Sequence, residues 1–350
     1  MTGKYMAYVG SYSYTGKAKG ITVYDVDVEA GKFIYRCEVE VDNSSYLKSS
    51  QNGKILYSIA DEGVVAFRVL PNGSLARLNS AKIKGMRGCH LSTSKADDYI
   101  FISGFHDGKI TVLHLNEDGS VGDIADGVFH KGLGSVAERS FRPHVSCSRL
   151  TPDERFLMVA DLGIDQIKVY RFDHKDGKIT LVDTIRCELE SAPKYFMFSS
   201  DGRFFYVLYE MKNVIEVYSY KEGERVPIVE KIQTISSTGS KPNQLTAACA
   251  MHFSPDEKHV FCSNAGDNTV SMYDRDDETG MLTLRFCLPI SGDYPKDIAI
   301  FPDGKHLASI NHEGSISFFK IDYEKGLLVM SDRSIKVNEP NCCEIVKIGD

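Results

Sequence analysis

Tryptophan is absent from the 350-residue chain and proline occurs only 11 times, whereas tyrosine and phenylalanine occur 18 times each. The lack of tryptophan excludes the Trp-Asp signature of WD40 propellers. Basic residues are also fewer than acidic ones: the chain has 41 Lys and Arg and 48 Asp and Glu, which gives a formal net charge of -7. This balance argues against a broad phosphate-neutralising surface, so we expect no nucleic-acid partner.

Long apolar runs are missing too. No stretch approaches the roughly 18 uncharged apolar residues of a membrane span, and the opening MTGKYMAYVGSY lacks the apolar core of a signal peptide. Nine cysteines occur without Cys-x-x-Cys spacing, and an odd number leaves at least one thiol free in a monomer. We therefore expect a soluble cytoplasmic protein with no membrane partner. The oligomeric state stays open.

Ligand motifs for cofactors are likewise absent. No spacing of His, Cys and Asp resembles a zinc site, and no glycine-rich phrase precedes a helix. We expect neither a metal nor a nucleotide cofactor, and small molecules are the favoured partners.

A short β-rich phrase recurs seven times along the chain. Its copies ITVY, VVAF, ITVL, IKVY, IEVY, VSMY and ISFF end at Tyr24, Phe67, Leu113, Tyr170, Tyr218, Tyr273 and Phe319. These ends lie 43 to 57 residues apart, which is the spacing of four-stranded propeller blades rather than of helical solenoids. The repeats predict an all-β, seven-bladed β-propeller of four-stranded antiparallel blades.

Turn signals divide each repeat into strands. Turns such as TPDER, SSDGR, SPDEK and FPDGK precede the runs FLMVAD, FFYVLY, HVFCSN and HLASIN, which have the length of strands buried between blades. The glycine of an Asp-Gly pair supplies the positive φ that a tight turn needs. Each repeat then continues through the aromatic phrase to a fourth strand.

The two ends of the chain supply the parts of one further blade. Residues 6–10 form a second-strand phrase with no first strand before it, and Cys342–Ile348 is a strand left over after blade seven. We predict that they pair, because this removes the open edges of the ring. Residues 1–350 then form a single domain.

The antiparallel blade also predicts where a site would lie. The start of each first strand and the end of each second strand meet on one rim of the central funnel. From these positions we take His144, Lys194, Glu210, Asn264, Lys296 and His90 as candidates, together with Arg142 beside His144. Packing between blades is an alternative for His90, and capping of its own loop is one for Asn264. We expect Asp61 and Asp161 to tie loops together.

Three phrases between Arg142 and Leu181 carry a family resemblance. They are Pro-His at 143–144, PDERFL at 152–157 and ADLGID at 160–165. They resemble the lactonase family of seven-bladed β-propellers, which includes 6-phosphogluconolactonases and carboxy-muconate lactonizing enzymes. Further similar phrases extend the resemblance over essentially the whole chain.

The resemblance implies roles for particular residues. It implies His144 and Glu210 as catalytic groups, and it places Lys194 and Lys296 where the family usually has arginines. Ala265 stands where a third arginine is usual. Because a planar guanidinium grips an oxyanion differently from an ammonium, we expect these changes to alter the choice of substrate.

Three functions follow as hypotheses. The first is a 6-phosphogluconolactonase-like hydrolase that opens a sugar or sugar-acid lactone by base-assisted attack of water, with His144 or Glu210 as the base. In it, Lys194 or Lys296 would bind a carboxylate or phosphate and Asn264 would donate a hydrogen bond, with His90 and Arg142 also in contact with the small anionic substrate. The second is a cycloisomerase of the carboxy-muconate type. The third is a propeller that binds a metabolite or a protein without catalysis.

Overall fold

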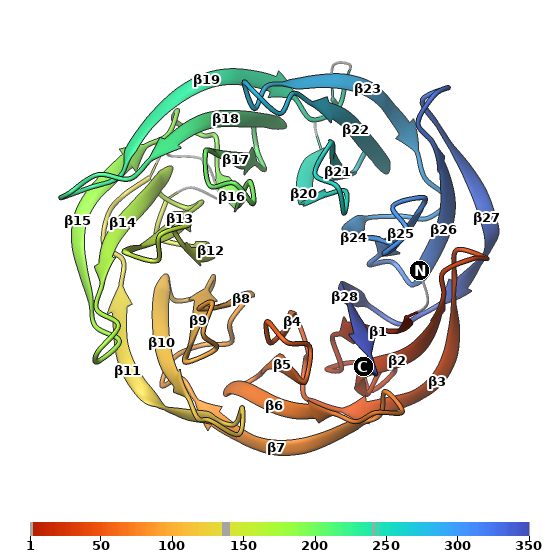
Figure 1. Cartoon of the computed structure of the whole chain (residues 1–350), viewed down its shortest axis with the longest axis horizontal. Coiled ribbons are helices and arrows are strands. Elements are labelled where there is room, and N and C mark those ends of the chain that lie inside the picture. Colours follow the sequence, from red (N-terminus) through yellow and green to blue (C-terminus); the bar gives the residue numbers. More distant parts are fainter. Residues whose placement is uncertain (1–2, 135–140, 240–241, 244, 350) are drawn as a thin grey trace.

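The computed structural model describes residues 3–134, 141–239, 242–243 and 245–349. In these ranges the chain forms seven four-stranded antiparallel sheets and no helix, arranged as blades around a central axis (Figure 1). The predicted seven-bladed β-propeller is confirmed. Since it holds no helix, the described chain contains none that could cross a membrane.

Each blade runs from an innermost strand beside the axis to an outermost strand at the outer edge of the ring. Blade one is β28 (Pro340–Ile348), β1 (Lys4–Ser11), β2 (Gly20–Asp27) and β3 (Lys32–Glu40). Blade two is β4 (Leu47–Ser49), β5 (Ile55–Ala60), β6 (Gly63–Val69) and β7 (Leu75–Lys82). Blade three is β8 (His90–Thr93), β9 (Tyr99–Gly104), β10 (Lys109–Leu115) and β11 (Val121–Phe129).

The remaining four blades follow the same order. Blade four is β12 (Val145–Leu150), β13 (Phe156–Asp161), β14 (Gln166–Phe172) and β15 (Ile179–Arg186). Blade five is β16 (Pro193–Phe198), β17 (Phe204–Tyr209), β18 (Val214–Lys221) and β19 (Ile228–Ser236). Blade six is β20 (Ala247–Phe253), β21 (His259–Ala265), β22 (Thr269–Arg275) and β23 (Leu282–Pro289). Blade seven is β24 (Pro295–Ile300), β25 (His306–Asn311), β26 (Ser315–Asp322) and β27 (Leu327–Lys336).

Blade one is assembled from both ends of the chain. Strand β28 pairs antiparallel with β1, from Lys4 opposite Ile348 to Gly10 opposite Cys342. This confirms the predicted closure, and it makes the C-terminal strand the innermost strand of the first blade (Figure 1). The ring is therefore fastened by backbone hydrogen bonds between the two ends of the chain.

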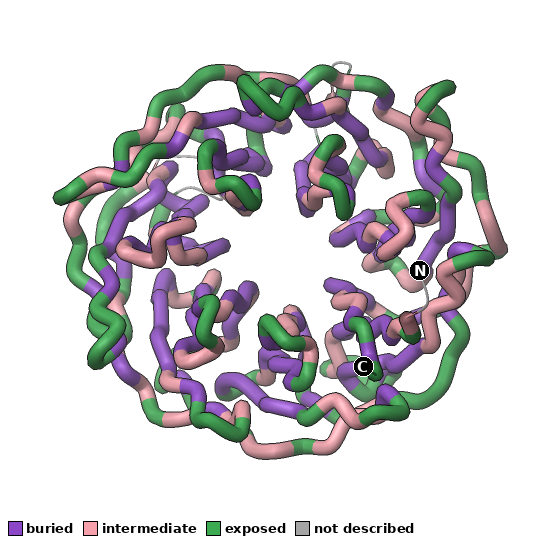
Figure 2. Tube along the Cα trace, viewed as in Figure 1, coloured by how far each residue is buried: buried purple, intermediate pink, exposed green. Residues whose placement is uncertain are grey.

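Burial follows the position of each strand in its blade. The second and third strands are almost wholly buried, as in β17 and β13, whereas the outer strands alternate between exposed and half-buried residues (Figure 2). The repeated aromatic phrases lie on the third strands and fill the spaces between blades. Phe318 of the ISFF phrase in blade seven, for example, contacts Phe33 of blade one edge-on with ring centres 5.2 Å apart.

The turns between first and second strands share one backbone conformation. Gly202 and Gly304 have positive φ angles of 71° and 67°, as the Asp-Gly signals predict. Glu154 and Glu257 adopt the same conformation with φ of 55° and 54°, which is unusual for residues other than glycine.

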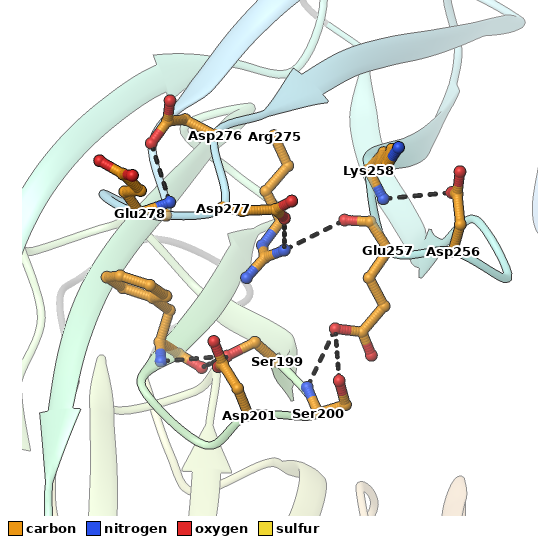
Figure 3. A network of polar contacts seen from close by, with 12 residues as sticks. Ser199, Ser200, Asp201, Asp256, Glu257, Lys258, Arg275, Asp276, Asp277 and Glu278 are labelled. Atoms are coloured by element: carbon orange, nitrogen blue, oxygen red, sulfur yellow. Dashed lines mark hydrogen bonds and ion pairs between the residues drawn. The ribbon is translucent and has the colours of Figure 1, made fainter.

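A hydrogen bond to the preceding blade accompanies this conformation at Glu257. Its carboxylate accepts bonds from the backbone N–H and the hydroxyl of Ser200, each at 3.0 Å, as Figure 3 shows. Glu154 likewise accepts a bond of 2.6 Å from the backbone of Lys95 in blade three. These contacts link neighbouring blades at the face where the inner strands end.

The predicted site lies at the opposite face. There the start of each inner strand lies beside the end of the second strand, as the antiparallel blade predicts. Pro193 at the start of β16 lies opposite Tyr209 at the end of β17, and Pro295 lies opposite Asn311 in blade seven. We call this side, where all inner strands begin, the start face, and the other side the end face.

We expect the closing strand to be essential for stability. Deleting residues 340–350 removes the buried side chains of Cys342, Val346 and Ile348, at roughly 1.5–3 kcal/mol each, from a total stability of about 5–15 kcal/mol. Thermal unfolding followed by circular dichroism should show loss of the cooperative transition. Deletion of residues 349–350 alone, beyond the strand, is the control and should leave it in place. An unchanged unfolding temperature in the longer deletion would contradict this role.

Candidate active site

Two lysines from the inner strands of blades five and seven lie near each other at the start face. Lys194 on β16 forms an ion pair with Glu210, with 2.7 Å between Nζ and Oε2, and its Nζ lies 3.8 Å from the Cys249 sulfur. Burial alone would lower the pKa of Lys194, but the Cys249 thiol and the Glu210 carboxylate raise it above its usual value. Lys194 is therefore a permanent cation.

Lys296 on β24 has no carboxylate partner of its own among the described residues. Its Nζ donates a 2.8 Å hydrogen bond to Oδ1 of Asn341 and lies 4.9 Å from the centre of the Tyr12 ring. Burial and the Lys194 ammonium lower the pKa of Lys296 to about 8. An anion between the two lysines would offset both the burial of the Lys296 ammonium and its repulsion by the Lys194 ammonium. This part of the start face therefore favours an anionic ligand.

His144 precedes β12 and is held in one orientation. Its Nδ1 lies 2.7 Å from the backbone oxygen of Phe105, and its ring stacks on the Phe105 ring at 4.4 Å. A carbonyl only accepts hydrogen bonds, so Nδ1 carries the proton and Nε2 holds the lone pair. Within the described chain Nε2 has no hydrogen-bond partner, and it is the atom of His144 that can act as a base.

The ADLGID phrase forms the support beneath His144. Asp161 is fully buried, and its Oδ1 accepts bonds from the backbone N–H groups of His144 at 2.7 Å and Gly163 at 3.1 Å. A side chain at Gly163 would collide with the Arg142 carbonyl and with the His144 ring. Asp161 thus ties loops together as expected, and the glycine is required by close approach.

The second acid of the phrase supports Lys194 in the same way. Asp165 accepts backbone hydrogen bonds of 2.8 Å from Glu190 and from Ala192, in the loop that leads into β16. One short phrase of blade four therefore positions the histidine of its own blade and the lysine of the next.

Cys89 links the histidine side of the start face to the lysine side. Its thiol donates to the backbone oxygen of Val145, the residue after His144, at 3.4 Å. Burial raises the pKa of Cys89 to about 12, although the charges of Lys194 and Lys296 act to lower it. Cys89 therefore lies between the backbone next to His144 and the two lysines.

The family model described as lactonase, 7-bladed beta-propeller, matches residues 6–345. The chain belongs to this family. A Bacillus subtilis protein named 6-phosphogluconolactonase is 27% identical over 98% of this chain and 99% of its own length. A Formosa agariphila protein of the same name is 26% identical over 95% of this chain and 96% of its own.

Solved structures of similar proteins share the whole fold. A Bacteroides fragilis protein, provisionally named a 6-phosphogluconolactonase, superimposes with a TM-score of 0.89 at 29% identity, covering 99% of this chain and 98% of that one. The periplasmic gluconolactonase of Pseudomonas aeruginosa has a TM-score of 0.90 at 23% identity over 99% of this chain and all of that one. The second likeness concerns the fold alone.

Three predicted binding residues of this lactonase-family propeller lie outside the cluster. Asn264 is buried and donates its amide to the Ser237 carbonyl at 2.9 Å, so it caps its own blade, the alternative left open from sequence. Arg142 is exposed, with its guanidinium 5.6 Å from the Phe141 ring centre. His90 is buried beside the Tyr46 and Tyr195 rings, as the packing alternative for it implies. The structure does not bring these three side chains to the lysines.

Two residues of the cluster were missed from the sequence. They are Tyr12 and Asn341, which contact Lys296 and lie at the end of β1 and the start of β28. The other candidates come from the start of a first strand or the end of a second strand. Once β28 pairs with β1, Asn341 and Tyr12 hold these two positions in blade one. The predicted pairing of the two ends of the chain therefore pointed to both residues.

The described residues contain no group of three or more His, Cys, Asp and Glu placed to hold a metal ion. All nine cysteines are free, and the adjacent Cys342 and Cys343 are buried on β28.

We predict that Lys194→Met raises the pKa of Lys296. The variant removes the like charge, whereas burial remains, so the pKa should rise from about 8 without reaching its ordinary value. Titration of the lysine side-chain ¹³C signals by NMR measures it. Lys212→Met, which breaks the exposed ion pair with Glu188 in the same blade, is the control and should leave the pKa unchanged. A fall or no change in Lys194→Met would contradict the coupling.

Proposed function

We propose that this propeller is a lactone hydrolase of the 6-phosphogluconolactonase type, acting on a small anionic sugar-derived lactone at the start face. The observation that carries the proposal is His144, on the same face as two lysines that favour an anion. Asp161 accepts a hydrogen bond from its backbone N–H, and the Phe105 carbonyl at Nδ1 selects the Nδ1–H tautomer of the neutral ring. The names of the Bacillus and Formosa relatives supply the substrate class.

The reaction adds water across the ring ester. Nε2 of His144 takes a proton from the attacking water, whose oxygen forms a bond to the lactone carbonyl carbon. The carbonyl oxygen becomes negatively charged in the tetrahedral intermediate, and the imidazolium that has formed on His144 offsets that charge. When the intermediate collapses, the bond to the ring oxygen breaks and the imidazolium returns its proton to that oxygen. The product is the open-chain hydroxy acid.

His144 is the stronger candidate for the base, and Glu210 for a positioning residue. Glu210 is paired at 2.7 Å with Lys194, and an ion pair stabilises the carboxylate against taking up a proton. In this role Glu210 keeps Lys194 charged and fixes its direction. Lys194 and Lys296 then bind the phosphate or carboxylate of the substrate as point charges, in place of arginine forks.

An assay of lactone opening by NMR tests the proposal. D-glucono-1,5-lactone, which is uncharged, and its 6-phosphate, generated in place, would each be compared with their spontaneous hydrolysis. We expect acceleration that is greatest for the phosphorylated lactone, and a fall in kcat of about 100-fold or more in His144→Gln. His174→Gln, at an exposed turn residue, is the matched control and should retain full activity.

Two results would overturn the proposal. If no lactone opens faster than it does spontaneously, although 6-phosphogluconate raises the unfolding temperature, the protein is a binder rather than an enzyme. Full activity in His144→Gln would exclude the mechanism.

A further inference from the structure

The end face of the propeller holds a second cavity, of about 500 Å³, which the proposed hydrolysis does not use. It is formed where inner strands β8, β12, β16 and β20 end, and its walls include Ser92, Arg149, Leu150, Tyr195, Phe198 and His252. Along β12, Arg149 is four residues beyond Val145, or roughly 13 Å of extended strand from the start face. The cavity is therefore distinct from the lysine cluster.

Arg149 carries a positive charge at this cavity and forms no ion pair with a carboxylate among the described residues. Its guanidinium donates to the Tyr195 hydroxyl and lies 5.0 Å from the centre of that ring. The other titratable groups beside it are the thiol of Cys147 and the hydroxyl of Tyr46, and both are neutral. The Nε–H is buried and has no hydrogen-bond partner in the described part of the chain.

The carboxylate of Asp297, in the central channel, has other partners. Asp297 is within 2.8 Å of the His252 Nε2 and accepts a 2.9 Å bond from the backbone of Cys343. His90 adds no second positive charge, because burial and the Arg149 charge keep its pKa well below the usual value. A half-buried guanidinium without a counter-charge costs stability, and an apolar residue would fill the same space at a lower cost.

The rest of the cavity combines a second cation with an apolar wall. Lys95 lines it, and the one acid on the wall, Glu154, accepts a bond from the Lys95 backbone. Leu150, Phe198 and Phe253 are half-buried along the same wall. A ligand that fits these surfaces has an oxyanion at one end and an apolar body at the other.

We propose that the end-face cavity is a binding site for a small organic acid, whose carboxylate or phosphate pairs with the guanidinium of Arg149 and whose apolar part lies against Leu150, Phe198 and Phe253. The guanidinium then gains the counter-charge that the protein does not supply. Its free Nε–H gains an acceptor, and a planar fork is well suited to two oxygens of one oxyanion.

Titration of the full-length protein tests this site. Benzoate and phenyl phosphate are the probes for a carboxylate and a phosphate, inorganic phosphate is the oxyanion without an apolar body, and benzamide is the uncharged control. At millimolar concentrations we expect benzoate or phenyl phosphate to shift one arginine Nε–H signal in the ¹⁵N NMR spectrum, namely the signal that is absent in Arg149→Lys. Benzamide and inorganic phosphate should bind at least about tenfold more weakly.

Variants separate the two faces. Arg149→Met should weaken binding of the better probe by about tenfold or more, because it removes the charge and keeps the volume. Lys296→Met, at the start face, should change it less than about twofold. Arg149→Met should in turn leave lactone hydrolysis within about twofold of wild type, so failure of this site and failure of the proposed reaction are told apart.

Three outcomes would overturn the site. They are the absence of any arginine shift with both probes, equal binding of benzamide and benzoate, and unchanged binding in Arg149→Met. If Arg149→Met fails to fold, the shift of the Arg149 signal in the wild-type protein decides the question alone.

Discussion

The backbone pairing of β28 with β1 is the constraint on which the rest of the structure depends. It turns seven sheets in a row into a closed ring, and a closed ring brings the beginnings of all inner strands to one face around the axis (Figure 1). It also places Tyr12 and Asn341, which come from opposite ends of the chain, on either side of Lys296. The C-terminal strand therefore helps to build the candidate site as well as the fold.

Repetition made the fold predictable and left the site only partly so. The seven aromatic phrases, the turn signals and the unpaired end strands predict the architecture, because each blade repeats the same local pattern. Antiparallel geometry alone predicts which strand positions lie at the start face, and Lys194, Glu210, Lys296 and His144 occupy such positions. The side chains of Asn264 and His90 come from positions of the same kind but turn into their own blade or between rings. The position of a residue in its strand fixes the place of its Cα atom, whereas its contacts decide the direction of its side chain.

The distribution of charge explains how an acidic protein can present an anion site. The net charge of -7 belongs to the chain as a whole, whereas Glu210 balances only one of the two start-face lysines. Local potential, rather than net charge, governs a small ligand at this range. A lysine carries the charge of an arginine without its planar fork. On the end face a guanidinium supplies the positive charge, and it has no carboxylate partner in the described part of the chain.

The most direct test of the account is a crystal structure of the protein with 6-phosphogluconate, the product of the proposed reaction. We predict that the phosphate of the ligand contacts Lys194 and Lys296, and that its carboxylate, which derives from the lactone carbonyl, lies next to Nε2 of His144. A ligand ordered only elsewhere on the propeller, with nothing bound among these three residues, would contradict the account.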